Sequence, residues 1–373
     1  MRSTIERGLL LFACALIAAA AATLSGCAST KSTSVAFPEK IVFKSIWGYL
    51  LRGREAELTG IEPFTHLCYF SASLNNEGRI EDTVARPVVF LADGSTPRID
   101  LVITELSSPP LMHFSLSPAY GVRPLLIDDI CRVAESFDGV QIDFETVSAD
   151  DGEYFWDFLR DLRGKLPPGK MLSVAVPART TPKADAYAYS NIAPLVDRVV
   201  IMAYDEHWSA SPPGPVASLP WCANVLDYAQ RAIENDKIVM GLPLYGRAWQ
   251  DKKLSRAMGF QNVQDIIAEK NPRMNYLSEL GSYFEYSEKV VVRVFYDDLR
   301  SLGEKLQLYK SRDVRSVAFW RIGLGPSDLW DSIGKEGASE LPAADQVQFG
   351  LPPTAGADSS LPPSPAPEAQ PGR

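Results

Sequence analysis

Soft metal ligands are scarce in this chain. It contains three histidines and five cysteines, and neither a CxxC pair nor an HExxH motif occurs. The sequence therefore offers no recognisable zinc site. No GxGxxG loop and no Walker loop follows a predicted strand, which removes the common nucleotide-binding signatures. We expect neither a cofactor nor a metal, and we look to carboxylates for any difficult chemistry.

Positive charge is also in short supply. Lys and Arg total 37 against 46 Asp and Glu, which gives a formal net charge of -9. This is the wrong sign for a protein that coats phosphates, so we expect no nucleic-acid partner. The chain does have 373 residues, 46% of them hydrophobic and 22% charged. That composition suits one large globular domain or two modest ones.

The N-terminus has the composition of an export signal. Arg2 and Arg7 precede an apolar run over residues 8–24, which is marginal for the ~20 apolar residues of a membrane span. The run closes with Leu-Ser-Gly-Cys at Cys27, which resembles the lipobox of bacterial lipoproteins. The resemblance implies that residues 1–26 are a signal peptide and that Cys27 carries lipid. It also implies an exported protein anchored to a membrane of the bacterial cell envelope. A cleaved soluble protein and an uncleaved anchor are the alternatives.

One folded body lies between the two ends. Residues 27–38 look like a short linker rich in Ser, Thr and Lys. Residues 337–373 form a Pro- and Ala-rich tail without apolar periodicity, which we expect to be disordered. The body then covers residues 39–336. Its three cysteines stand in apolar surroundings and are expected to be buried thiols rather than disulfides: Cys68, Cys131 and Cys222.

Short β-rich runs recur through this body, and stretches of helical periodicity such as 151–166 and 220–235 separate several of them. The eight predicted strands are residues 41–51, 65–72, 99–103, 139–144, 171–176, 196–203, 237–242 and 314–319. Alternating strands and helices predict a parallel sheet, and eight strands predict a closed (β/α)8 TIM barrel. An open doubly wound sheet is the alternative. Residues 250–298 are predicted to form a small α+β insertion between strands 7 and 8 that builds one wall of a cleft.

The fourth predicted strand carries the most informative pattern. Because side chains alternate along a strand, Gln141, Asp143 and Glu145 share one face and would point into the barrel. Asp143 and Glu145 are ~6.6 Å apart along the strand, so their carboxyl groups can meet and share a proton. A protonated carboxyl can donate to a leaving oxygen. The alternatives are a structural polar cluster and a metal site.

The run Asp-Gly-Val-Gln-Ile-Asp-Phe-Glu over residues 138–145 resembles the DGxDxDxE signature of glycoside hydrolase family 18, the chitinase-like (β/α)8 enzymes. Similar motifs end later predicted strands: Met-Ala-Tyr-Asp at 202–205, Gly-Leu-Pro-Leu-Tyr-Gly-Arg at 241–247 and Phe-Trp at 319–320. Residues 203–208, 212–217 and 219–221 resemble the bacterial branch that includes spore cortex-lytic N-acetylglucosaminidases. Gln141 stands where chitinases carry an aspartate, and members of that branch tend to have an amide there.

The resemblance implies a retaining reaction on β-1,4-linked N-acetylglucosamine-containing glycans, in which the substrate's acetamido carbonyl attacks. The expected substrate is peptidoglycan or its fragments. Glu145 would be the general acid and base, Asp143 would orient the acetamido group, and Tyr204 would donate to its oxygen. The implied substrate-binding residues are Gln141, Met202, Asp205, Tyr245, Arg247 and Trp320, with Trp320 under the sugar. We expect a monomer. A sugar-binding lectin on the same barrel is the alternative function.

Two further expectations concern neighbouring residues. Tyr49 and Phe70, after the first and second strands, are predicted to be core residues rather than site residues. Because an amide at Gln141 can only hydrogen-bond Asp143, the shared proton should favour the pair of Asp143 and Glu145. We therefore predict an acidic-to-neutral pH optimum.

Overall fold

The computed structural model describes residues 39–250, 260–277 and 281–337. The predictions for the signal peptide, for Cys27, for the linker up to residue 38 and for the tail from residue 338 lie outside the described residues. Among the described residues, no helix combines the length and the apolar character that a bilayer crossing needs.

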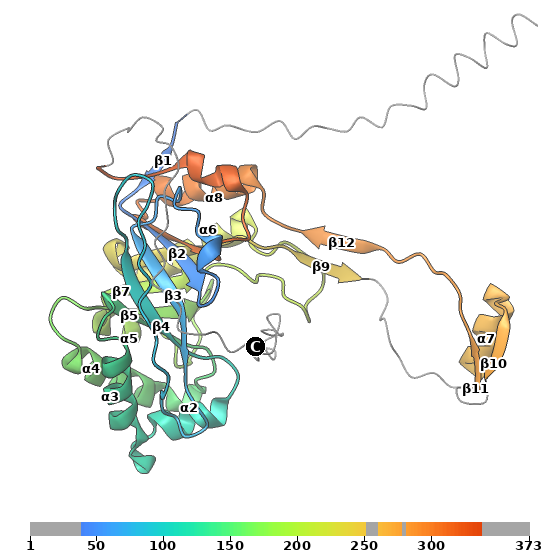
Figure 1. Ribbon diagram of the computed structural model, residues 1–373, viewed down its shortest axis with the longest axis horizontal. Coiled ribbons are helices and arrows are strands. Elements are labelled where there is room, and N and C mark those ends of the chain that lie inside the picture. The colour runs from blue at the N-terminus through green and yellow to red at the C-terminus, as the bar shows by residue number, and fades with distance from the viewer. Residues whose placement is uncertain (1–38, 251–259, 278–280, 338–373) are drawn as a thin grey trace, which may run out of the picture. The chain divides into compact units, whose positions relative to one another are not determined.

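Eight parallel strands close into a barrel, as predicted (Figure 1). Hydrogen-bonded neighbours follow the order β13-β2-β3-β4-β5-β6-β7-β8 around it. The bounds are β2 Ser45–Leu51, β3 His66–Ser73, β4 Arg98–Glu105, β5 Gly139–Phe144, β6 Met171–Pro177, β7 Arg198–Met202, β8 Ile238–Pro243 and β13 Ser316–Trp320. Because all eight run the same way, their C-terminal ends gather at one mouth of the barrel, where loops carry function in this architecture.

Helices connect the strands and bury their apolar stripes against the outside of the barrel. The α-helices are α2 Pro109–Leu116, α3 Val122–Val133, α4 Gly152–Lys165, α5 Tyr189–Ile192, α6 Leu219–Ala232 and α8 Leu299–Ser311. The short 3-10 helices are η1 Glu55–Glu57, η2 Pro118–Tyr120, η3 Ala149–Asp151, η4 Ala193–Leu195, η5 Asn235–Lys237 and η6 Ser327–Ser332. The periodicities over 151–166 and 220–235 thus correspond to α4 and α6. In α4, Phe155, Phe158 and Leu162 are fully buried, as their three- and four-residue spacing requires.

The first predicted strand, 41–51, is wrong in one respect, because the structure divides it in two. β1 (Ile41–Phe43) pairs in parallel with β14 (Ile333–Lys335) outside the barrel, and only β2 joins the barrel. The chain bends at the exposed Lys44, between buried Phe43 and buried Ser45. An uninterrupted strand would place these two side chains on one face. The bend instead lets Phe43 join the outer core while β2 enters the barrel wall.

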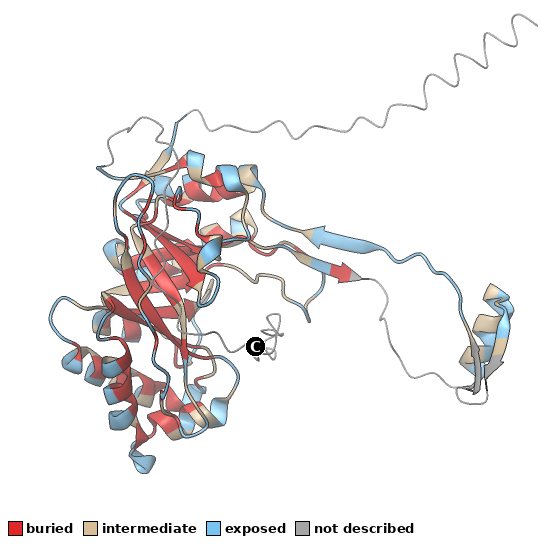
Figure 2. Ribbon diagram, viewed as in Figure 1, coloured by how far each residue is buried: buried red, intermediate tan, exposed pale blue. Residues whose placement is uncertain are grey.

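An α+β segment follows the seventh barrel strand, as predicted. It contains β9 (Arg247–Gln250), α7 (Phe260–Lys270), β10 (Met274–Leu277), β11 (Gly281–Phe284) and β12 (Val292–Phe295). β9 pairs with β12 and β10 with β11, both antiparallel. Most of β12 is exposed, in contrast to the buried barrel strands (Figure 2). β9 already begins at Arg247, so residues of the seventh-strand motif enter this segment.

Two apolar clusters form the core. The larger one lies between the strands and the helices. The smaller one fills the barrel and consists of inward side chains from six strands, Trp47, Tyr49, Cys68, Val102, Val200, Val239 and Ala318. Cys68, Cys131 and Cys222 are free thiols. Cys68 and Cys222 are buried as predicted, whereas Cys131 on α3 is partly exposed because it lies beside the buried stripe of that helix.

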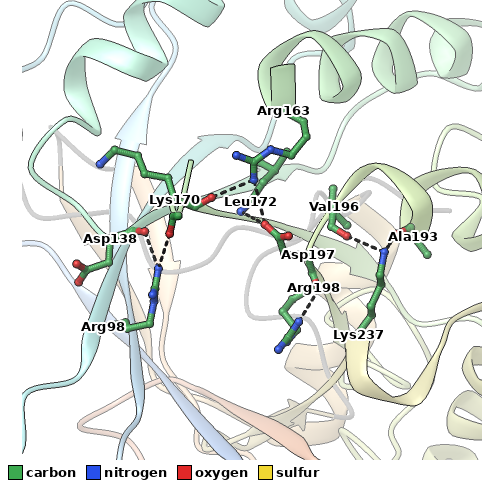
Figure 3. A network of polar contacts seen from close by, with 11 residues as sticks. Arg98, Asp138, Arg163, Lys170, Leu172, Ala193, Val196, Asp197, Arg198 and Lys237 are labelled. Atoms are coloured by element: carbon green, nitrogen blue, oxygen red, sulfur yellow. Dashed lines mark hydrogen bonds and ion pairs between the residues drawn. The ribbon is translucent and has the colours of Figure 1, made fainter. Parts of the chain in front are cut away.

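The N-terminal end of the barrel is closed by a network of polar contacts (Figure 3). Lys170 donates to the backbone carbonyls of Ala134 and Glu135 at 3.0 and 2.8 Å. Two aspartates accept backbone amides near the starts of strands: Asp138 accepts that of Ile99 on β4, and Asp197 accepts that of Leu172 on β6, both at 2.8 Å. Further donors to carbonyls or to Asp197 are Arg98, Arg163, Arg198 and Lys237. Backbone groups at the strand ends are thereby satisfied, which stabilises the fold.

Candidate active site at the C-terminal mouth

β5 presents the predicted polar column to the barrel interior. Gln141 is 0% exposed and Asp143 is 4% exposed, while Glu145 lies just beyond the end of the strand and is partly exposed. Val140, Ile142 and Phe144 alternate with them and belong to the outer core. The strand therefore folds as its alternation predicted, with apolar side chains towards the helices and polar ones inside. Glu145 is the member of the column nearest the mouth.

The amide of Gln141 is held from both sides. The Tyr49 hydroxyl donates to Gln141 Oε1 at 2.6 Å, and Gln141 Nε2 donates to Ser173 Oγ at 3.2 Å. Both partners come from other strands, β2 and β6. These contacts determine which way the amide faces, and they leave its carbonyl oxygen occupied.

Asp143 is a buried acid beside a second acid. Burial raises the pKa of Asp143 well above its usual range, and the charge of Glu145 raises it further. Asp143 Oδ1 has no hydrogen-bond partner among the described residues. Both causes favour the protonated form of Asp143, because an ionised carboxylate here would lose hydration and face a like charge. The pair can therefore hold one proton at a pH where an exposed carboxyl has lost it.

Tyr204 follows β7 and lies among these acids. Burial raises the pKa of Tyr204 well above its usual range, and the charges of Tyr245, Asp143 and Glu145 add to that effect. Its hydroxyl is therefore kept as a proton-bearing donor. Gly241 on β8 makes room for it, because a Cβ there would lie 3.1 Å from Tyr204 Cε1 and 2.7 Å from a backbone oxygen. This close approach explains a glycine at the start of the seventh-strand motif.

Asp205 organises the side of the site next to Tyr204. Its backbone lies in the left-handed region with φ 61°, a conformation that aspartate tolerates better than most residues. Oδ1 of Asp205 accepts from Nη2 and Nε of Arg247 at 2.7 and 3.0 Å, and also from the Tyr245 hydroxyl. The ring of Tyr245 stands edge-on to that of Tyr204, with centroids 6.2 Å apart. The structure thus brings together four predicted site residues from two motifs.

An aromatic group lies beside the polar column. Trp320 ends β13 and meets the rings of Tyr49 and Phe70 edge-on, with centroids 5.2 and 4.9 Å away. Trp320 and Phe70 are both partly exposed, so part of their ring surface remains available to a ligand. Met202, at the mouth end of β7, is partly exposed as well, and its register partner is Pro177.

Sequence reasoning missed three of the neighbours described above. Tyr49 was predicted to be core; its ring is indeed buried, but its hydroxyl holds Gln141. Phe70 was also predicted to be core; it does pack against the cluster inside the barrel, and its partly exposed ring also extends the aromatic group of Trp320. Ser173 was not singled out. A polar residue at the centre of the otherwise apolar run 171–176 was the signal that could have found it, because the register pairs it with Gln141.

The geometry combines a buried acid beside a partly exposed one, a phenol donor and a partly exposed indole. In the described ranges, no group of three or more His, Cys, Asp or Glu side chains is arranged to hold a metal ion. Such an arrangement can bind a polar group through hydrogen bonds and give a proton to an oxygen above Glu145. It resembles the machinery of general-acid chemistry more than that of a structural polar cluster.

Comparisons with known proteins address the family and the fold of this chain. The family model described as glycosyl hydrolases family 18 matches residues 124–325, which include β5, Tyr204, Arg247 and Trp320. The putative sporulation-specific glycosylase YdhD of Bacillus subtilis is 32% identical over 269 residues, covering 68% of this chain and 62% of that protein. The chain thus spans less than two thirds of that relative.

Other relatives carry similar names. The cortical fragment-lytic enzyme of Bacillus anthracis is 28% identical over 300 residues, covering 72% of this chain and 67% of that protein. Among solved structures, the spore cortex-lytic enzyme SleL of Bacillus cereus superposes with a TM-score of 0.62 at 24% identity. The match covers 79% of this chain and 76% of that one, and it shows that the barrel fold is shared.

Proposed function

Because the chain belongs to glycosyl hydrolase family 18, we propose that it is a retaining glycosidase acting on β-1,4-linked, N-acetylglucosamine-containing glycans. The reaction would be substrate-assisted, so that the 2-acetamido carbonyl of the sugar attacks the anomeric carbon. The observation that carries the proposal is the pairing of buried Asp143 with Glu145 at the barrel mouth. Names that the relatives carry, a cortical fragment-lytic enzyme among them, favour peptidoglycan or its fragments as the substrate.

Glu145 is the general acid of this mechanism. It is partly exposed at the mouth, so it can reach the glycosidic oxygen, donate a proton to it and later accept one from the attacking water. The neighbouring Asp143 is the second carboxyl group that shares the proton. Its raised pKa keeps a proton within the pair up to a higher pH than an exposed carboxyl would.

Asp143 and Tyr204 act on the acetamido group. In its ionised form Asp143 accepts the acetamido N–H and offsets the positive charge that develops as the oxazolinium ring closes. The Tyr204 hydroxyl, which its surroundings keep protonated, donates to the acetamido oxygen. Together they hold the carbonyl in line with the anomeric carbon, which is the orientation that lowers the barrier.

The remaining residues bind the sugar. Trp320 and Phe70 offer an apolar platform under the ring. Arg247 and Tyr245 hold Asp205 through one oxygen, so the other oxygen of Asp205 is left to accept from sugar hydroxyls. Gln141, fixed by Tyr49 and Ser173, precedes Asp143 by two residues on the inward face of β5. Met202 completes the wall at the end of β7.

The experiment that tests the proposal is Glu145→Gln, assayed on a 4-methylumbelliferyl N-acetylglucosamine oligomer. Loss of the general acid should lower kcat by roughly 10² to 10⁴. Glu153→Gln, an exposed position in the first turn of α4, is the matched control and should leave turnover unchanged. A wild-type protein that binds the glycan but does not cleave it would overturn the proposal and support the lectin. Mass spectrometry of products from purified sacculi and from chitin oligomers separates the two substrates.

We further propose that the mature protein is a lipid-anchored monomer of the cell envelope, processed at Cys27 after a signal peptide of residues 1–26. The charged start, apolar run and lipobox-like tetrapeptide support this. Residues 27–38 would then be a linker, and residues 337–373 a tail beyond the barrel. Replacing residues 1–27 with a cleavable signal peptide that lacks a lipobox should move the protein from the membrane fraction to the soluble fraction, and light scattering of that form should give a monomer mass. Unchanged membrane association of that form would exclude the lipid anchor.

A further inference from the structure

The segment that carries Glu145, residues 144–147, is held on one side by the end of β4 and on the other by the loop that follows β6. Glu145 itself lies just after the last residue of β5, where the chain leaves the barrel wall for α4. A side chain at such a point moves with the loop unless the backbone before and after it is held in place. Two buried residues outside the polar column make those contacts, Tyr187 on one side and Glu105 on the other.

Tyr187 closes this segment with a single oxygen. Its hydroxyl donates to the carbonyl of Phe144 at 2.7 Å and accepts the amide of Val147 at 3.0 Å. The backbone before Glu145 and the backbone after it therefore meet on one phenol. Tyr187 is 4% exposed, and its own amide donates to Asp185 at 3.0 Å. Asp185 in turn pairs with Arg179 at 2.5 Å, so the phenol is presented from an anchored loop.

Glu105, the last residue of β4, holds the same segment from the strand that neighbours β5. Its backbone carbonyl accepts the amide of Glu145 at 2.9 Å, and its Oε2 accepts the Thr146 hydroxyl at 2.5 Å. Its Oε1 accepts the amide of Ser108 at 2.9 Å, and Ser108 is the N-cap of α2. Glu105 is 7% exposed. One carboxylate thus ties the residue after Glu145 to a rigid helix start.

We propose that Tyr187 and Glu105 are positioning residues for Glu145, which hold its carboxyl at the distance from the glycosidic oxygen that proton transfer requires. This inference rests on the proposed function and deepens it. Neither residue belongs to the column of Gln141 and Asp143, and neither is among the causes that raise the pKa of Asp143. Their contacts converge on the backbone within two residues of Glu145, and a misplacement of the acid by about 1 Å can cost about 10² in rate.

The test compares two tyrosines of the same loop region. Tyr187→Phe removes only the hydroxyl between Phe144 and Val147. Tyr189→Phe is the matched control, because Tyr189 is equally buried and also donates to a backbone carbonyl, that of Pro177 at 2.7 Å. For Tyr187→Phe we expect kcat to fall about 10-fold or more with KM changed less than about 2-fold. For Tyr189→Phe we expect kcat to be unchanged at a similar loss of Tm.

A second arm shows whether the effect passes through Glu145. In a Glu145→Gln background, Tyr187→Phe should lower kcat no further, because the group that it positions is already gone. Equal losses for both tyrosine variants, or a full additional loss in that background, would overturn the inference. Should Tyr187→Phe not fold, Thr146→Val and Thr146→Ser serve instead. The valine variant should lose kcat and the serine variant should restore it, since serine keeps the hydroxyl for Glu105.

Failure of this inference is distinct from failure of the proposed function. A wild-type protein without any turnover contradicts the glycosidase. A wild-type protein that turns over normally, together with a Tyr187→Phe variant that retains full kcat, contradicts only the positioning roles.

Discussion

At the N-terminal end of the barrel, charged side chains meet opposite charges or backbone dipoles, whereas at the C-terminal mouth two acids meet each other. Lys170 at the first end points its ammonium group at backbone carbonyls, and Asp197 accepts both an arginine and a strand amide. Asp143 at the other end is buried, and the neighbour that affects its pKa is the acid Glu145. The first arrangement lowers the energy of the folded chain; the second raises it and creates a reactive proton.

Asp100 on β4 complicates this comparison. It lies inside the barrel, one inward position above Arg98, and both of its carboxylate oxygens lack a hydrogen-bond partner among the described residues. Burial raises the pKa of Asp100 to about 7, although the charge of Arg98 opposes the shift. A perturbed acid therefore also exists away from the mouth, so a raised pKa does not by itself mark the site. At the mouth, the second acid, the phenol and the indole surround the perturbed group.

The largest expected effect comes from breaking the acid pair. Asp143→Asn should lower kcat by about 10² to 10³, because the acetamido group loses the charge that stabilises the intermediate. It also removes the carboxyl whose raised pKa keeps a proton within the pair, so the alkaline limb of the pH profile should move to lower pH. A kcat/KM profile from pH 4 to 9 measures both effects. Asp150→Asn on the exposed η3 is the control, and a profile identical to wild type for Asp143→Asn would contradict the pairing.

Replacing Asp100 sharpens the comparison by separating burial from function. The folded state keeps the Asp100 proton up to about pH 7, whereas the unfolded chain releases it near pH 4. The free energy of unfolding therefore falls as pH rises between those values. Asp100→Asn removes this penalty and should raise the free energy of unfolding by on the order of 2 kcal/mol at pH 8, and by less at pH 5. Denaturant titrations at both pH values test this, and an equal change at the two would contradict it.

Breaking the network at the N-terminal end should affect stability alone. Lys170→Met removes the ammonium group that donates to the carbonyls of Ala134, Glu135 and Phe137, and it should lower the free energy of unfolding by about 1–2 kcal/mol. Lys165→Met removes an exposed ion pair with Asp128 and should cost less than about 1 kcal/mol. Thermal melts measure the stability of both variants. Turnover of both variants should stay at the wild-type value. A loss of kcat in folded Lys170→Met would show that the two ends are coupled.

The smallest effect on turnover is expected from the hydrogen bond between Tyr49 and Gln141. Tyr49→Phe frees Gln141 Oε1, which can then accept the proton of Asp143 and draw it away from Glu145. We expect kcat to fall by less than about 10-fold, with KM almost unchanged, because the acids and the sugar platform remain. Steady-state kinetics on the labelled oligomer measure the change. An increase of kcat would mean that the phenol restrains the site rather than supports it.

Contacts within one strand or helix could be predicted well from the sequence. The alternation in 139–145 was sufficient to place Gln141, Asp143 and Glu145 on one face, and the spacing in 151–166 was sufficient for α4. Contacts between elements could not be predicted. The hydroxyl of Tyr49 reaches Gln141 across the barrel, and Arg247 reaches Asp205 from another strand. Tyr187 and Glu105 gave no signal at all, because a buried tyrosine and a strand-end glutamate have no motif around them.

The amino-acid sequence by itself determined the order of strands and helices and the polar column of Gln141, Asp143 and Glu145, because these depend on residues close together in the chain. The tertiary structure alone decided which side chains meet. Barrel closure and strand register bring Tyr49, Ser173, Tyr204 and Trp320 around one carboxyl pair, and they place Lys170 and Asp197 at the opposite end. The pKa of Asp143 follows from that packing, since burial and a facing charge exist only once the barrel has closed.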